Sequence, residues 1–280
     1  MKVRIAYQTQ YAYAVPVSFS QHLFRLFPKA DRSARVRSIA FQTNPGALVN
    51  MRRDLFDNEV ASCAYTGKST LLGAQLDIDL EIEPRNAFAF IVAPHAVALP
   101  FAYTAREAHV LTPYLGAGPA LELPFWKAPA SPQPTVETLV GLNEALHREL
   151  AYERRDEGAA YAPEETLRLG RGSCRDFAVL LAEMARGLGL AARLASGYLC
   201  EFGDTEKRAE GALHAWTELY VPGAGWLGFD PTNGYLCNHN HLTAAVGLTP
   251  ADISPVLGDY FSDHRVPHTM TASLQVKLGD

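Results

Sequence analysis

Long apolar runs are missing from this 280-residue sequence: no stretch of about 18 apolar residues is free of charge, as a membrane-spanning helix would require. The N-terminal residues turn polar after a few positions, which predicts no secretory signal. With a formal net charge of −5, the chain has no basic excess for nucleic acid or an anionic membrane surface. No glycine-rich loop is followed by the Lys-Ser/Thr pair of a phosphate-binding site. We therefore expect no nucleic-acid, membrane or nucleotide partner.

Cysteine is also scarce. The chain has four cysteines, at positions 63, 174, 200 and 237, and no two of them form a C-x-x-C pair. In a chain of this size without a predicted signal, this spacing favours reduced thiols and a cytoplasmic location over a disulfide framework. Because an isolated cysteine is usually a small buried apolar residue, we expect that role for Cys63, Cys200 and Cys237.

Alternating apolar and polar residues dominate the first ninety positions. Residues 75–82 contain Leu-Asp-Ile-Asp-Leu-Glu-Ile, whose period of two is typical of a half-buried antiparallel strand. Residues 2–13 and 36–43 alternate in the same way, so we predict a small β-sandwich or barrel. Residues 94–134 contain eight prolines and are predicted to be a connector.

The pattern then becomes helical. Leucines at helical spacing predict an amphipathic helix over residues 136–152, and a second helix should begin at Pro163 and end at Gly170. A third helix is predicted to begin at Cys174, directly after Gly172 and Ser173. Three strands are expected to follow, at residues 192–199, 214–221 and 226–229, the last two joined by a hairpin turn.

Cys174 differs from the other cysteines because it stands at a predicted helix start. Free backbone N–H groups there stabilise a thiolate, and they can also bind an oxyanion that develops on an attacked carbonyl. A nucleophilic cysteine needs a base and an orienting group. His214 begins one strand of the hairpin and Asp230 ends the other, so antiparallel pairing should bring imidazole and carboxylate together.

Three motifs carry a family resemblance: Gly-x-Cys174-Arg-Asp-Phe-Ala, Leu-His214-Ala-Trp-Thr-Glu-Leu-Tyr and Gly-Trp-Leu-Gly-Phe-Asp230-Pro-Thr-Asn. Together they resemble the core of the microbial transglutaminase-like superfamily, over about residues 134–245. The resemblance implies an α+β, papain-like core in which a cysteine-bearing helix packs on an antiparallel sheet. The region before it is similar to the β domain often fused to this core, and we expect it to be β-sandwich-like.

The resemblance also implies a function. Cys174 would be the nucleophile, His214 the general base and acid, and Asp230 the residue that orients His214. The enzyme would act on an amide of a protein or peptide, as a peptidase, amidase or transglutaminase, through a thioester. The alternative is a catalytically silent module that binds proteins. No cofactor and no metal are expected, and the sequence does not indicate an oligomeric state.

Two domains follow from these patterns: residues 1–125, β-rich with the connector, and residues 126–280, catalytic. The last strand, about 269–278, is expected to pair back onto the N-terminal sheet.

Three alternatives remain. Cys237-x-His239-x-His241 could offer metal ligands on one strand face, although no fourth ligand is near. Trp216 could line the site or belong to the core, and residues 201–212 could be a gate or a solvated loop.

Overall fold

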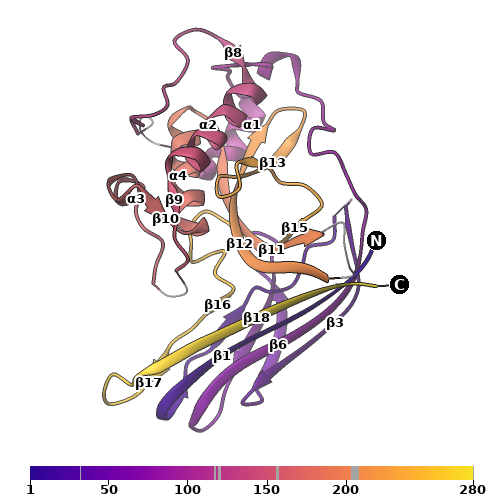
Figure 1. Cartoon of the computed structure of the whole chain (residues 1–280), viewed down its shortest axis with the longest axis vertical. Helices are drawn as coiled ribbons and strands as arrows, with labels where there is room; N and C mark the ends of the chain where they lie inside the picture. The colour runs from indigo at the N-terminus through magenta and orange to yellow at the C-terminus, as the bar shows by residue number, and fades with distance from the viewer. Residues whose placement is uncertain (32, 117, 119–120, 156–157, 203–207, 280) are drawn as a thin grey trace.

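One ten-stranded sheet extends through both halves of the molecule (Figure 1). The computed structural model describes residues 1–31, 33–116, 118, 121–155, 158–202 and 208–279. The N-terminal half of the sheet contains three strands from the start of the chain, β1 (Lys2–Phe19), β3 (Ala34–Asn44) and β6 (Ser69–Ile82). It also contains two strands from the end of the chain, β17 (Tyr260–Phe261) and β18 (His268–Leu278). The C-terminal half comprises β11 (Ala192–Phe202), β12 (Arg208–Val221), β13 (Gly225–Asp230), β14 (Tyr235–Leu236) and β15 (His241–Gly247). The two halves join where β12 pairs with β18.

The N-terminal region is a two-layer β structure. A second sheet, in the order β16 (Val256–Leu257), β2 (His22–Phe24), β5 (Glu59–Ala64) and β4 (Leu48–Arg53), packs on the first. The alternation in β6 has the predicted consequence: Leu76, Ile78 and Leu80 are buried between the sheets, while Asp77 and Asp79 lie on the other face. The predicted β-rich N-terminal region is therefore confirmed.

The C-terminal strand lies inside the N-terminal sheet. β18 pairs antiparallel with β1 from Val3 opposite Leu278 to Tyr13 opposite His268, and the two chain ends lie close together in Figure 1. The first and last segments of the chain thus share a layer. The division into domains at residue 125 stays a prediction.

Three helices cover one face of the C-terminal strands: α2 (Thr135–Glu149), α3 (Pro163–Leu169) and α4 (Cys174–Gly187). α4 buries Phe177, Leu180 and Met184 against the sheet, and a parallel bridge links β9 (Ala151–Tyr152) to β10 (Arg171–Gly172) below it. The predicted α+β fold with a helix packed on an antiparallel sheet is confirmed. Among the described residues, no helix combines the length and apolar character needed to cross a membrane.

The proline-rich connector contains more structure than its composition predicts. It includes a 3-10 turn at Pro94–Ala96, β7 (Ala98–Leu99), α1 (Ala105–Leu111), a second 3-10 turn at Thr112–Tyr114 and β8 (Gln133–Pro134). α1 begins at a capping box: the backbone N–H and hydroxyl of Thr104 donate to the Glu107 carboxylate, and Glu107 N–H donates back. Sequence reasoning missed this Thr-x-x-Glu signal among the prolines around it.

The segment before His214 is also more regular than expected. β11 continues to Phe202 and β12 begins at Arg208, so most of residues 201–212, interpreted as a loop, have strand backbone. Residues 203–207 lie outside the described residues. A gating role for the segment stays a prediction.

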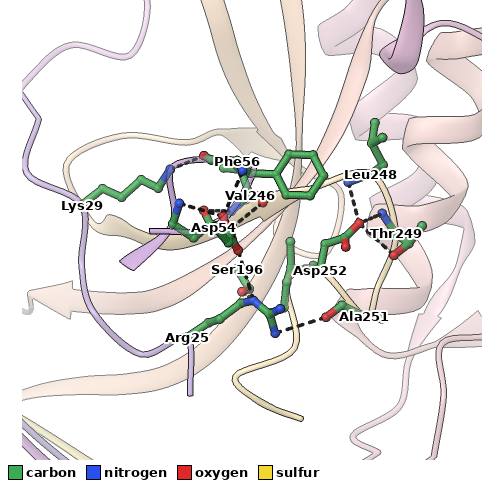
Figure 2. Close-up of polar contacts among 12 residues, drawn as sticks. Arg25, Lys29, Asp54, Phe56, Ser196, Val246, Leu248, Thr249, Ala251 and Asp252 are labelled. Carbon is green, nitrogen blue, oxygen red and sulfur yellow. Dashed lines mark hydrogen bonds and ion pairs between the residues drawn. The ribbon is translucent and has the colours of Figure 1, made fainter. Parts of the chain in front are cut away.

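A turn of the N-terminal region, residues 54–58, covers the edge of β15 (Figure 2). Asn58 donates from Nδ2 to the carbonyl of Val246 (2.8 Å) and accepts at Oδ1 from the Val246 N–H (2.9 Å), so its amide replaces a neighbouring strand. The Asp54 carboxylate accepts from the N–H groups of Phe56 and Asn58 and fixes the turn. The Phe56 ring packs against the buried cluster of Ala195, Trp216 and Val246.

Two cations fasten this turn to the rest of the molecule (Figure 2). Arg25 pairs with Asp54 (Nε to Oδ2, 3.5 Å) and donates to the carbonyl of Ala251 (3.4 Å), while Lys29 donates to the carbonyl of Phe56 (3.1 Å). The N-terminal region thus reaches, through the turn, the strands that follow His214.

Candidate active site

Cys174 is the first residue of α4, and its surroundings fix that helix start. Ser173 precedes it with extended backbone, and the backbone N–H and hydroxyl of Ser173 both donate to Asp176 Oδ2 at 2.7 Å. Gly172 lies so close to α4 that a Cβ there would come within 2.9 Å of Asp176 Cβ. Glycine in the Gly-x-Cys motif therefore allows the preceding strand to approach the helix. The Cys174 side chain is partly exposed.

Asp176 is a site residue that sequence reasoning missed. It is fully buried, and it also accepts from the Tyr161 N–H (2.7 Å) and pairs with Arg155 (2.7 Å). Burial would raise the pKa of Asp176, but these hydrogen bonds and the cation hold it below the ordinary value. The Ser-x-x-Asp pattern at residues 173–176 is a capping-box signal that could have revealed it.

His214 and Asp230 meet as the hairpin geometry predicts. β12 and β13 pair with Thr217 opposite Phe229, so the end of β13 lies opposite the part of β12 that carries His214. His214 Nε2 lies 2.8 Å from Asp230 Oδ2. Because Nε2 is engaged there, Nδ1 is the ring nitrogen left for the hydrogen bond between His214 and Cys174. The structure thus brings Cys174, His214 and Asp230 together in that order.

The charges of Cys174, His214 and Asp230, which we call the row, favour a thiolate on Cys174 beside an imidazolium on His214. Burial opposes ionisation of Cys174, but the hydrogen bond and positive charge of His214 and the N–H of Ala215 bring the pKa of the thiol below its ordinary value. Burial likewise opposes a charged His214, and hydrogen bonds to Asp230 and Cys174 outweigh it and raise the pKa of the imidazole. Asp230 is buried, yet bonds from His214 and His241 keep the pKa of its carboxyl well below the ordinary value.

The other three thiols have the opposite character. Burial raises the pKa of Cys63 to about 11 and that of Cys200 to about 12, and it raises the pKa of Cys237 well above the ordinary value. Cys63 and Cys200 lie in the core between the β layers, and Cys237 packs beside Trp216. Among the cysteines, only Cys174 combines exposure with a lowered pKa.

A second histidine, His241, also contacts the carboxylate of Asp230. Its Nε2 lies 3.1 Å from Oδ2, the oxygen that His214 uses. The side-chain amide of Asn233 donates to the same oxygen (2.8 Å), and the N–H groups of Thr232 and Asn233 donate to Oδ1 (3.0 and 3.2 Å). Sequence reasoning considered His241 only as a metal ligand. Its contact depends on the pairing of β15 with β11, which no local pattern announces.

The proposed metal stretch 237–241 does not converge on one point. His239 accepts from the N–H of Arg85 (3.3 Å), Cys237 packs beside Trp216, and His241 faces Asp230. Among the described residues, the donor atoms close enough to share a metal ion are those of His214, Asp230 and His241, within 4.8 Å of one another. Both imidazoles are already hydrogen-bonded to the Asp230 carboxylate, and metal independence stays a prediction.

Trp216 belongs to the core. It is 1% exposed and lies behind the two imidazoles, with ring centroids 6.4 Å from His214 and 5.3 Å from His241. A cavity of about 550 Å³ lies beside it, and its lining includes Glu218, Trp226 and His241 but neither Cys174 nor His214. Thr217, between Trp216 and Glu218 on β12, bonds instead to α4, so the cavity lies on the face of the sheet that α4 does not cover.

Comparisons with known proteins agree with the motifs. Residues 127–231 match the model of the transglutaminase-like superfamily, and residues 3–88 match that of the bacterial transglutaminase-like N-terminal region. The solved structure of a proposed cysteine protease from Cytophaga hutchinsonii, 16% identical, covers 100% of this chain and 92% of its own with a TM-score of 0.64, which shows a shared fold.

Curated relatives match over shorter stretches. An uncharacterized protein of Mycobacterium leprae is 36% identical over 92 residues, which is 32% of each chain. An uncharacterized protein of Mycobacterium tuberculosis is 30% identical over 138 residues, 47% of this chain and 44% of the relative. The matches therefore span less than half the length of these relatives.

Proposed function

Because this chain belongs to the transglutaminase-like superfamily, whose core supports thiol-dependent chemistry, we propose that it transfers or hydrolyses the acyl group of an amide through a thioester on Cys174. One observation carries the proposal. His214 is hydrogen-bonded to Asp230 and acts on Cys174, and its influence lowers the pKa of this thiol alone among the four.

The proposed reaction has two halves. The Cys174 thiolate attacks the amide carbonyl carbon, and N–H groups at the start of α4 stabilise the oxyanion. When the oxyanion collapses, the carbon–nitrogen bond breaks and the leaving amine takes the proton from His214, which leaves a thioester. His214 then removes a proton from the acceptor as it attacks the thioester and keeps that proton, so that Cys174 leaves as a thiolate and the thiolate–imidazolium pair is restored. Asp230 orients His214 and stabilises its imidazolium form throughout.

The acceptor and the acyl donor decide the outcome. Water as acceptor gives hydrolysis of a peptide bond or deamidation of a glutamine, whereas a primary amine gives cross-linking. We propose a protein or peptide as the acyl donor, because this two-step reaction needs only an amide carbonyl that reaches the partly exposed Cys174.

Thiol alkylation tests the activated nucleophile without a known substrate. Iodoacetamide at about pH 6 should label Cys174 well ahead of the other three cysteines, since only a thiolate reacts quickly. Site-resolved mass spectrometry of the full chain measures the four rates, and His214→Ala serves as the variant with an unactivated thiol. Equal labelling of Cys174 and Cys63 would sink the proposal.

A peptide library then separates the reactions. Glutamine-containing peptides, incubated with and without a primary amine, should yield adducts, deamidated peptides or cleavage fragments, which product masses distinguish. Cys174→Ala is the matched control. Selective labelling with no turnover of any peptide would favour the catalytically silent binding module instead.

A further inference from the structure

The Asp230 carboxylate, at one end of the row, contacts two imidazoles. His214 and His241 both direct Nε2 at Asp230 Oδ2, at 2.8 and 3.1 Å. The His241 side chain is 1% exposed, and its ring meets Trp216 (centroids 5.3 Å apart) and Tyr235 (5.8 Å) edge to face. Aromatic contacts on two sides and a hydrogen bond at the tip fix the ring orientation. His241 is therefore held in one orientation by the residues around it.

The hydrogen bonds of His241 fix its proton. The N–H of Asn238 lies 3.4 Å from His241 Nδ1, so Nδ1 is an acceptor and carries no proton. Nε2 then carries the single proton and donates it to Asp230. Burial outweighs the attraction of Asp230 and lowers the pKa of His241, in agreement with a neutral ring.

Asp230 does not need His241 to stay in place. Asn233 donates to it twice and the Thr232 N–H once, all from the turn that follows β13. What His241 adds is a third donor on the oxygen that binds His214. The positive end of its N–H dipole faces this oxygen, and it opposes the positive charge that the same oxygen stabilises on His214.

We propose that His241 is a positioning residue of the reaction: as a neutral donor it shares Asp230 Oδ2 with His214 and limits how tightly that oxygen retains the imidazolium proton. The proposal rests on the proposed function, because it concerns the proton that His214 must deliver to the leaving amine. An imidazolium held too tightly would be a weak acid, and the first half of the reaction would slow.

Few titratable groups act on this pair. Those that act on His241 are Asp230 of β13, His214 of β12 and His239 of the preceding turn. Those that act on His214 are Asp230 and Cys174 of α4. The two imidazoles also act on each other directly, with ring centroids 6.2 Å apart, but the atom that both of them contact is Asp230 Oδ2.

Two isosteric substitutions test the donor. The amide nitrogen of glutamine can reach the place of the imidazole Nε2, whereas that of asparagine is one bond too short. The rate of Cys174 alkylation by iodoacetamide, measured against pH in the full chain, has an acid inflection where the thiolate forms and an alkaline inflection where His214 loses its proton. In His241→Asn we expect the alkaline inflection to rise by about one pH unit. In His241→Gln we expect the wild-type profile.

The controls separate tuning from damage. A merely structural loss that loosened Asp230 would lower the alkaline inflection, because the imidazolium would lose its counter-charge. His239→Asn changes a histidine two residues away without contact to Asp230 and should leave the profile unchanged. The inference is overturned if His241→Asn leaves the inflection in place or lowers it, or if His241→Gln moves it equally. Should His241→Asn not fold, the profile of His241→Gln decides: unchanged supports the inference and shifted refutes it.

A spectroscopic readout is independent of alkylation. Nitrogen-15 chemical shifts of the His241 ring should show a proton on Nε2 and none on Nδ1 between pH 6 and pH 8, and a doubly protonated ring would contradict the assignment. The two proposals fail in different ways. If wild-type Cys174 is not labelled selectively, the proposed function falls. If it is, and the His241 variants behave alike, only this inference falls.

Discussion

Replacing Asn58 with alanine deletes a buried amide that serves both backbone groups of one strand residue. Asn58 donates to the Val246 carbonyl (2.8 Å) and accepts from the Val246 N–H (2.9 Å), and its side chain is fully buried. β15 pairs with β11 on its other side, so the substitution leaves these two groups of Val246 buried without the partners they have now. The hydrogen bond from Asn58 to Asp54 (3.1 Å) is lost as well.

The expected loss follows from those contacts. An unsatisfied buried donor or acceptor costs about 1–3 kcal/mol, so two of them reduce the free energy of unfolding by about 2–6 kcal/mol. A domain has about 5–15 kcal/mol in total, so the change should be plain in a urea titration. Asn58→Asp keeps an acceptor for the N–H but sets a carboxylate oxygen against the Val246 carbonyl and the Asp54 carboxylate. We expect it to be at least as destabilising.

The positions of the tryptophans make the assay selective. Trp216 and Trp226 lie on β12 and β13, and Trp126, the third tryptophan, packs against the core between the helices and these strands, so their fluorescence reports on the C-terminal half. Far-ultraviolet circular dichroism reports on the strands of both halves. Because Asn58 belongs to the N-terminal region and its partner to β15, both signals should lose stability by the same amount. Asn50→Ala, an exposed asparagine on β4, is the matched control and should change stability by less than about 0.5 kcal/mol.

Two results would refute this reasoning. A loss below about 1 kcal/mol in Asn58→Ala would mean that water or a backbone shift satisfies Val246 at little cost. A dichroism transition that moves while the fluorescence transition stays would mean that the 54–58 turn does not couple the two halves.

Two further predictions concern charged groups at the α4 start. In His214→Ala, the thiol loses its hydrogen-bonding and positively charged neighbour while burial still opposes its ionisation, so the alkylation profile of Cys174 should move to or above the ordinary pKa of about 8.5, while the exposed His95→Ala leaves it unchanged; a profile that stays at the wild-type position would contradict the ion pair. Arg155→Ala leaves the buried Asp176 carboxylate without its cation and should reduce stability at pH 7 by about 3–5 kcal/mol. Because the pKa of Asp176 is lowered by folding, this contribution is present above the ordinary carboxyl pKa of about 4 and is lost as pH falls further; equal effects of the substitution in urea titrations at pH 7 and pH 3 would count against it.

Local signals account for what the sequence predicts well. The start of α4 at Cys174 follows from Gly172 and Ser173 before an apolar helical face, and the Gly170 stop of α3 appears as a left-handed residue. The hairpin at residues 222–225 sets the register of β12 and β13, and register alone places His214 near Asp230. In each case the residues that decide the geometry are close in sequence.

Non-local pairing accounts for what the sequence does not reveal. The contact between His241 and Asp230 depends on the pairing of β15 with β11, two strands that are not neighbours in the sequence. Asn58 contacts Val246 although 188 positions separate the two residues. The alternating Cys237-x-His239-x-His241 pattern indicated a shared face, whereas only His241 begins the strand β15. A local period cannot specify which strand edge a residue will meet.

The support of Asp230 comes from three separate parts of the chain. Residues 127–231 match the superfamily core and contain Cys174, His214 and Asp230, yet His241 lies beyond them. The strand that His241 begins is held at its other end by Asn58, within the region that matches the N-terminal model. Phe56 of the same turn packs on the cluster that contains Trp216, and the Trp216 ring lies beside the rings of both histidines. The N-terminal β region is thus connected to the Asp230 carboxylate through packed side chains and the edge of β15.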